Sequence, residues 1–271
     1  MKKKDLVIAV SLAIMVIAIS SALYAGGIIM ITPPYKVRDL AKNFLRYSYN
    51  PWNGKLTSYA LNVVSAIIWD YRGLDTVLET AVLYSAVIGI TVLFRGIVEI
   101  RGLKHRGLSL LVKMPSRIVI PLIIAVGISL AVHGHLTPGG GFQAGAVATV
   151  TPALIITIFS IEALYVLKLR IQKLFLMRTI AFISILMISI SLFLYSLMSL
   201  TNAYVLQNMI REHSNISMPH WFIDVPLAGS IFLYNILEFF TVFAGLTYVF
   251  IVYSMRRKEV ENMWEEVETY E

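Results

Sequence analysis

Four ionisable side chains are the strongest candidates for chemistry, because each lies inside or beside a long apolar stretch. Arg72, Asp75 and Glu79 follow one another at three- and four-residue steps, which places them on one side of a helix. Glu238 stands alone in a later apolar run. Ionisable groups at membrane depth are costly and usually mark the path of an ion. We therefore expect these four residues to be candidates for an ion path.

Each of these groups also has a structural interpretation. In the functional interpretation, Arg72 holds Asp75 ionised. Glu79 is then left to exchange a proton or to bind a hard cation through oxygen. In the structural interpretation, Thr76-x-x-Glu79 is a capping box, and the acids favour the positive end of a helix. Glu238 can equally hydrogen-bond a neighbouring helix. The sequence leaves both interpretations open.

Four histidines raise the question of a metal site. His133 and His135 stand two apart, so on a helix they point roughly 200° from each other. His213 and His220 fall in a later polar loop, where Glu212 completes no known ligand spacing, and the chain has no cysteine. We expect interfacial polar residues, no metal and no cofactor. A stand-alone membrane metalloenzyme built on these four histidines is kept as the alternative.

The first histidine pair opens a polar corner between two apolar runs, and this corner carries a family resemblance. The string HGHLTPGGGFQAG closely resembles the hallmark of the MnhB family, the MrpB-type subunits of Mrp-type multisubunit Na+/H+ antiporters. In that family a four-helix subunit carries HGHxxPGGGFQGG at its first helix–helix corner, and only Ala144 departs from it here. The resemblance implies a structural role for ten residues: His133, Gly134, His135, Pro138, Gly139, Gly140, Gly141, Phe142, Gln143 and Gly145.

A second resemblance covers the first three candidates. The string WDYRGLDTVLE is similar to the carboxy-terminal region of the large MrpA subunit, where D-[FY]-R-G-[LF]-D-T-L-G-E precedes a transmembrane helix. Leu78 replaces the usual glycine. In archaeal membrane-bound hydrogenases and related sulfur-reducing complexes this piece is a separate small subunit. The resemblance thus implies a fusion, with an MrpA-like region at 1–105, an MnhB-like domain at 106–256 and an acidic tail at 257–271.

Composition indicates a membrane protein. Hydrophobic residues make up 58% of the 271, above the share typical of soluble domains, and the mean hydropathy is +0.75. The charged residues behind the formal net charge of +7 lie between the apolar runs. This arrangement is what the positive-inside rule predicts for a membrane protein, so we expect no nucleic-acid partner. Sixteen of the 23 lysine and arginine residues fall on one set of alternate connections. That distribution predicts six spans in the cell membrane with both termini cytoplasmic.

The expected fold is therefore an all-α integral membrane protein with six transmembrane helices, arranged as two plus four, and one amphipathic interfacial helix. The amphipathic helix is expected over 56–68, with Thr57, Ser58, Asn62 and Ser65 on its polar face. The fifth span is expected to begin at about Thr179, after a basic connector that includes Arg178. Pro121 is expected near the start of the third span, after a connector that runs to Arg117.

Together the two resemblances imply a non-catalytic membrane subunit of an Mrp-type Na+/H+ antiporter module, within an archaeal ion-translocating respiratory complex of the hydrogenase or sulfur reductase type. Implied partners are other Mrp-type membrane subunits, the lipid bilayer, and transported Na+ or H+. So few charges lie within the spans that we expect these partner subunits to be obligatory.

Overall fold

The computed structural model describes residues 3–26, 37–94, 107–167, 169 and 171–254. The chain divides into two compact units after Asn43. The first unit contains α1 (Lys3–Ala25) and the beginning of α2 (Asp39–Ser48). The α1 helix is apolar all around and carries no charge from Leu6 to Ala25, which is typical of a helix that crosses a bilayer.

The second unit holds the other elements. A short helical segment, α3 (Val63–Ala66), runs into the π-helical turn η1 (Ile67–Tyr71). The remaining helices are α4 (Gly73–Leu93), α5 (Leu110–Val132), α6 (Gly141–Ile158), α7 (Ile161–Val166), α8 (Ile171–Ser199) and α9 (Ser230–Ser254). One small hairpin joins β1 (Trp221–Phe222) to β2 (Val225–Pro226). Six of the described helices are long and apolar enough to cross a membrane, which confirms the expected all-α membrane fold.

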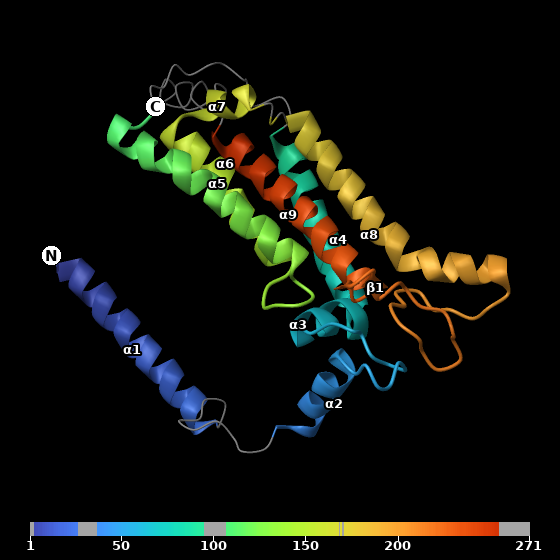
Figure 1. Cartoon of the computed structure of the whole chain (residues 1–271). Coiled ribbons are helices and arrows are strands. Elements are labelled where there is room, and N and C mark those ends of the chain that lie inside the picture. Colours follow the sequence, from blue (N-terminus) through green and yellow to red (C-terminus); the bar gives the residue numbers. More distant parts are fainter. Residues whose placement is uncertain (1–2, 27–36, 95–106, 168, 170, 255–271) are drawn as a thin grey trace. The chain divides into compact units, whose positions relative to one another are not determined.

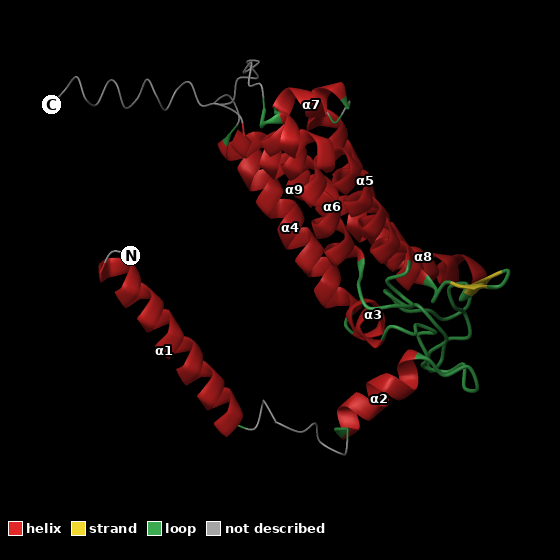
Figure 2. Ribbon diagram, turned by 60° about the vertical axis from the view of Figure 1, so that its left-hand side comes forward, coloured by secondary structure: helices red, strands yellow, loops and turns green. Residues whose placement is uncertain are grey.

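The last helix is the centre of the bundle. It packs against α4, α5, α6 and α8, and the figures show these five helices running side by side (Figures 1 and 2). Its buried side chains reach from Ile231 near one end to Ile251 near the other. The corner 133–140, the connection 200–229 and α3 gather at one end of this bundle, called the loop end below, and α7 lies at the opposite end (Figure 2).

Two helices begin earlier than hydropathy predicts. α5 begins at Leu110, so Pro121 lies in its interior, and α8 begins at Ile171, so Arg178 lies inside a helix and not in a connector. The reason in α8 is packing: Leu174 is 1% exposed and joins the cluster of Ile155, Leu164, Ala244 and Ile251. Burial of that apolar face stabilises the first two turns despite their charges.

The expected amphipathic helix over 56–68 is wrong in its first half, and only the residues from Val63 onward are helical. Residues 56–62 are not helical, and Leu56 and Tyr59 have positive φ angles of 64° and 53°, which interrupt a right-handed helix. The side chains expected on its polar face are also not exposed, since Thr57 and Ser58 are fully buried. These polar side chains hydrogen-bond neighbouring segments, which supplies the energy that a surface helix would otherwise gain from its apolar face.

The capping box, one of the two interpretations that the sequence left open, is absent as well. Arg72 precedes the first residue of α4 and makes no side-chain cap, while the Thr76 hydroxyl donates to the Ile68 carbonyl at 2.6 Å. That carbonyl belongs to the π-helical turn, where the usual backbone pairing is shifted. Thr76 therefore fastens the turn to α4, and the Glu79 side chain is not engaged as its capping partner.

The expected boundary between the MrpA-like and MnhB-like regions, at 105 and 106, lies outside the described residues, as does the acidic tail from 257. Both stay predictions. Within the described part, residues 44–93 pack in the same compact unit as α5 to α9. The described residues from Phe44 onward thus form one packed bundle, whichever region they are expected to belong to.

Candidate functional site

Two of the predicted ion-path residues meet in one cavity. Glu79 from α4 and Glu238 from α9 both line a space of about 300 Å³. The other lining residues are Val64, Ile68, Thr76, Thr80, Leu83, Phe142, Gln143 and Val242. Thr76, Thr80 and Gln143 add oxygen atoms to a wall that is otherwise apolar. We call this space the carboxylate cavity.

The structure does not bring Arg72 and Asp75 into that cavity. Their side chains pair with each other, with Arg72 Nε 2.7 Å from Asp75 Oδ2. Both are well exposed, at 69% and 48%, and they line a separate, wider space of about 700 Å³ at the loop end. Of the three residues expected on one side of the helix, only Glu79 thus reaches the carboxylate cavity, and its carboxylate has no ion pair among the described residues.

Glu238 holds the start of α6. Its Oε2 accepts a hydrogen bond from the Phe142 backbone N–H at 3.0 Å, and Asn235 Oδ1 accepts one from the Gly141 N–H at 3.2 Å. The first backbone N–H groups of a helix have no partner within the helix, and its dipole favours negative charge there. The hydrogen bond to a neighbouring helix that the sequence allowed for Glu238 is therefore present.

The glycines of the motif let α6 approach α9. A Cβ at Gly141 would lie 2.7 Å from the Glu238 Cβ, and one at Gly145 would lie 2.7 Å from the Val242 Cβ. Only glycine fits at these distances. The preceding Gly139 has a φ of 140°, which a residue with a side chain rarely adopts. These positions together bring the first turn of α6 to the wall of the carboxylate cavity.

Side chains of the segment before α4 hydrogen-bond the corner 133–140, a role that the sequence did not predict. Asn62 Nδ2 donates to the carbonyls of Gly134 and Thr137, at 2.7 and 2.9 Å, and its Oδ1 caps α3 at Val64 N. Ser65 also donates to the Gly134 carbonyl, at 2.6 Å. In the sequence, Asn62 and Ser65 are merely polar residues of the helix expected over 56–68. Their spacing does not reveal a hydrogen-bond partner that lies more than sixty residues away.

The four histidines make separate contacts, and His213 lies in a turn of the connection 200–229 with a φ of 62°. His133 Nδ1 lies 3.0 Å from the Ser129 carbonyl on an exposed helix end, and His135 Nε2 lies 2.7 Å from the Pro226 carbonyl. His220 stacks on Tyr59, with ring centroids 4.3 Å apart. Burial lowers the pKa of His135, so it rests neutral. Among the described residues no group of three or more His, Asp or Glu is placed to hold a metal ion.

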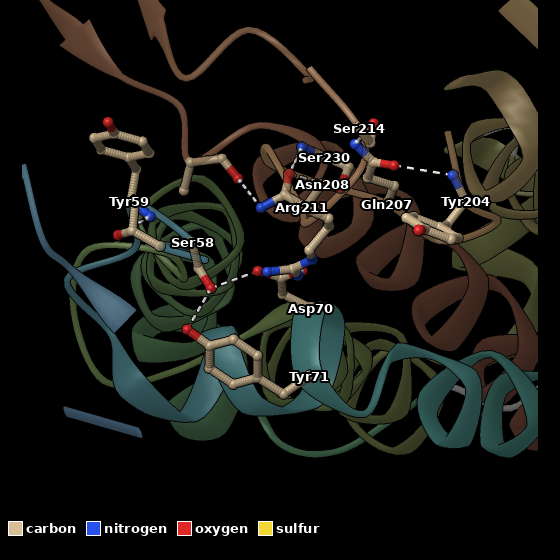
Figure 3. A network of polar contacts seen from close by, with 12 residues as sticks. Ser58, Tyr59, Asp70, Tyr71, Tyr204, Gln207, Asn208, Arg211, Ser214 and Ser230 are labelled. Atoms are coloured by element: carbon tan, nitrogen blue, oxygen red, sulfur yellow. Dashed lines mark hydrogen bonds and ion pairs between the residues drawn. The ribbon is translucent and has the colours of Figure 1, made fainter. Parts of the chain in front are cut away.

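A buried ion pair, which sequence reasoning also missed, fixes the loop end (Figure 3). Asp70 in the π-helical turn pairs with Arg211 from the connection 200–229, and the Ser58 hydroxyl donates to Asp70 Oδ2 at 2.6 Å. Burial raises the pKa of Asp70, and the Arg211 charge and the Ser58 hydrogen bond oppose that rise. Burial also raises the pKa of the adjacent Tyr71 to about 12, so its hydroxyl stays protonated.

Neighbouring amides hold the connection itself in place. Asn208 Oδ1 accepts from the Ser230 backbone N–H at 2.7 Å, and Gln207 Nε2 donates to the Ser214 hydroxyl at 2.8 Å (Figure 3). Asn208 thereby caps the beginning of α9. The loop end thus holds a polar network that fixes where α4, with Glu79, and α9, with Glu238, begin.

The double role of Glu238 gives a first prediction. We expect Glu238→Gln to keep the fold, with a loss of less than about 1 kcal/mol in the free energy of unfolding, because the amide oxygen can still accept from Phe142 N. Glu238→Leu should cost about 1–3 kcal/mol, because it leaves that buried N–H unpaired. Thermal unfolding of the purified complex compares the two. Equal losses in both variants would mean that the charge, and not the hydrogen bond, holds α6.

Comparisons with known proteins agree with this geometry. Residues 111–248 match a family model described as a domain related to the MnhB subunit of Na+/H+ antiporters. A comparison with curated protein sequences found no match.

Two solved structures share the fold. A chain of the membrane-bound sulfane sulfur reductase, an archaeal respiratory membrane complex, is 23% identical with a TM-score of 0.60, and the match covers 92% of this chain and 100% of that one. A chain of the Mrp complex from Dietzia sp. DQ12-45-1b is 19% identical with a TM-score of 0.62, and the match covers 94% of this chain and 26% of that one. At these identities the similarity establishes the fold.

Proposed function

The chain belongs to the family of domains related to the MnhB subunit of Na+/H+ antiporters, and from this premise we propose that it is a non-catalytic membrane subunit of an Mrp-type Na+/H+ antiporter module. The observation that supports this function is the carboxylate cavity. It places two acids, Glu79 and Glu238, within an all-helical bundle whose helices are long enough to cross the bilayer. Intramembrane carboxylates of this kind usually serve ion or proton movement.

Glu79 is the exchanging group in this proposal. It lies six residues into α4, about 9 Å from its start along the axis. Arg72 is already neutralised by Asp75, and Glu238 is engaged at the start of α6, so Glu79 has no fixed partner among the described residues. Its carboxylate can bind a proton or, with the threonine oxygens of the cavity, a hard cation such as Na+.

The parent complex is the finer part of the proposal. We place the chain in the cell membrane of an archaeon, within a respiratory complex of the membrane-bound hydrogenase or sulfur reductase type, next to other Mrp-type membrane subunits. The resemblance of the two motifs and the shared fold with the sulfane sulfur reductase chain support this placement. Identification of the co-purifying subunits tests it, because a nickel–iron-type large subunit and iron–sulfur partners distinguish the respiratory complex from a free antiporter.

Glu79→Gln tests the proposed exchange. The amide keeps the size of the side chain but cannot take up a proton, so we expect sodium-dependent proton movement in sealed vesicles to fall at least roughly tenfold. The complex should still co-purify, because Glu79 makes no hydrogen bond or ion pair within the described residues.

Asp224→Asn is the matched control, since this acid lies on the exposed hairpin, away from the cavity. It should transport as the native complex does. Native transport in an assembled Glu79→Gln complex would contradict the proposal. Loss of transport together with loss of the subunits would assign Glu79 a packing role instead.

A further inference from the structure

Arg178 is the most unusual charge in the described part of the chain. It lies in α8, which is long and apolar enough to cross the membrane, and it is 2% exposed. Its Nε, Nη1 and Nη2 atoms are all buried, and none makes a hydrogen bond of ordinary geometry with a described residue. Buried polar groups are nearly always hydrogen-bonded, so an arginine that lacks such partners calls for an explanation.

Aromatic rings and a glycine surround the guanidinium. Its Cζ lies 4.3 Å from the centroid of Tyr84 on α4 and 5.3 Å from that of Phe175 on its own helix. A Cβ built on Gly245 of α9 would lie 3.5 Å from the Arg178 Cδ. Ring faces attract a cation but supply no negative charge. Arg178 is therefore a fixed positive charge that has no ion pair with a described residue, and arginine does not lose its proton in proteins.

The position of this charge relative to the carboxylate cavity is specific. On α4, Thr80 and Leu83 line the cavity, and the next residue, Tyr84, covers Arg178. On α9, Val242 lines the cavity, and Gly245 one turn further contacts Arg178. Along both helices the guanidinium thus lies further from the loop end than the cavity does, on the side of α4 and α9 that packs against α8.

We propose that Arg178 is the electrostatic barrier that closes the carboxylate cavity toward the α7 end of the bundle. A cation or proton that reaches Glu79 then leaves by exchange at that carboxylate and does not leak onward between α4, α8 and α9. The proposal rests on the proposed function and adds a selectivity-determining residue to its site. Fixed arginine charges exclude cations and protons from pores by the same physics.

The size of the effect follows from Coulomb's law. At roughly 10 Å in a partly buried setting, one fixed charge changes the energy of a passing monovalent cation enough to change its rate about tenfold. We therefore expect Arg178→Met, which keeps an unbranched apolar side chain, to raise uncoupled sodium and proton conductance of the complex about tenfold. Replacement of a buried charge by an apolar side chain is often tolerated by the fold.

The measurement uses the whole complex in sealed vesicles. Proton entry is followed after an acid jump without sodium, with the membrane potential clamped by potassium and valinomycin, and sodium entry is followed with a radioactive tracer at equal pH on both sides. Arg178→Lys is the charge-keeping variant. It should stay as tight as the native complex at neutral pH and become leaky as the pH rises, because a buried lysine loses its proton far more readily than arginine.

Two groups besides Arg178 itself face this position, the hydroxyls of Tyr84 on α4 and Tyr248 on α9. The native complex carries the same two tyrosines, so its conductance over the same pH range is the reference for the lysine variant. A rise that occurs equally in both would belong to the tyrosines and would overturn the proposal.

The outcomes separate this proposal from the proposed function. If the leak of Arg178→Met disappears when Glu79→Gln is added, the leak passes through the carboxylate cavity, as proposed. A leak that persists in the double variant, or native conductance in an assembled Arg178→Met complex, overturns the barrier. Failure of both Met and Lys variants to assemble assigns Arg178 to packing and overturns it too. The proposed function fails separately, if Glu79→Gln alone leaves coupled exchange unchanged.

Discussion

Asp70→Asn is expected to lower the free energy of unfolding by about 3–5 kcal/mol, the usual cost of breaking a buried ion pair from one side. The Asp70 side chain is fully buried and Arg211 is 19% exposed, so the asparagine would leave a largely buried guanidinium without its counter-charge. The Ser58 hydroxyl could still donate to the new amide oxygen, so the lost charge dominates. Thermal unfolding of the purified complex in detergent measures the change.

The chain offers a matched control for this prediction. Arg72 and Asp75 form the same kind of pair on the surface, so Asp75→Asn should cost no more than about 1 kcal/mol. The double variant Asp70→Leu/Arg211→Met should be more stable than Asp70→Asn alone, because it removes both buried charges. Equal losses at Asp70 and Asp75 would show that burial does not strengthen the first pair.

This ion pair matters for the site because of what it joins. Asp70 lies in the π-helical turn that leads into α4, and Arg211 belongs to the connection whose Asn208 caps α9. The two helices that carry Glu79 and Glu238 thus begin from one polar network at the loop end. Weakening that network should shift the two acids relative to each other as well as lower stability.

The helices that cross the membrane could be predicted from sequence because their signals are local. A run of apolar residues long enough to span a bilayer identifies each of them, and Pro138 with the following glycines marks the corner between α5 and α6. The segment 56–62 could not be predicted in this way. Thr57 and Ser58 fit a helical polar face by spacing, but their hydrogen-bond partners lie elsewhere in the fold.

The site could be predicted residue by residue but not as an arrangement. Glu79 and Glu238 are conspicuous because they are acids in apolar runs, but only the packing of α4 on α9 places them in one cavity. Charge alone places Arg178 in a connector, whereas packing extends α8 to include it. Asp70 stands in the WDYRGLDTVLE string, and its burial depends on Arg211, far along the chain.

The second large effect concerns the close approach of α6 to α9. The double variant Gly141→Ala/Gly145→Ala should lower the free energy of unfolding by about 2–6 kcal/mol, since overpacking typically costs about 1–3 kcal/mol at each site. The new methyl groups would meet the Cβ atoms of Glu238 and Val242, each at 2.7 Å, and the Asn235 and Phe239 carbonyls. These are backbone and Cβ atoms, so rotation of a flexible side chain cannot relieve the contacts, and α6 must move away from α9.

Gly89→Ala is the control for this pair of substitutions. Gly89 also lies in a membrane-spanning helix, but a Cβ there would meet nothing within 4 Å. Alanine at that position should leave stability unchanged or raise it by up to about 1 kcal/mol, because it favours the helix. The same movement of α6 would separate Phe142 N from Glu238, so the double variant should also lose coupled exchange. A stable double variant with native exchange would show that the corner can relax, and that the glycines serve some purpose other than close packing.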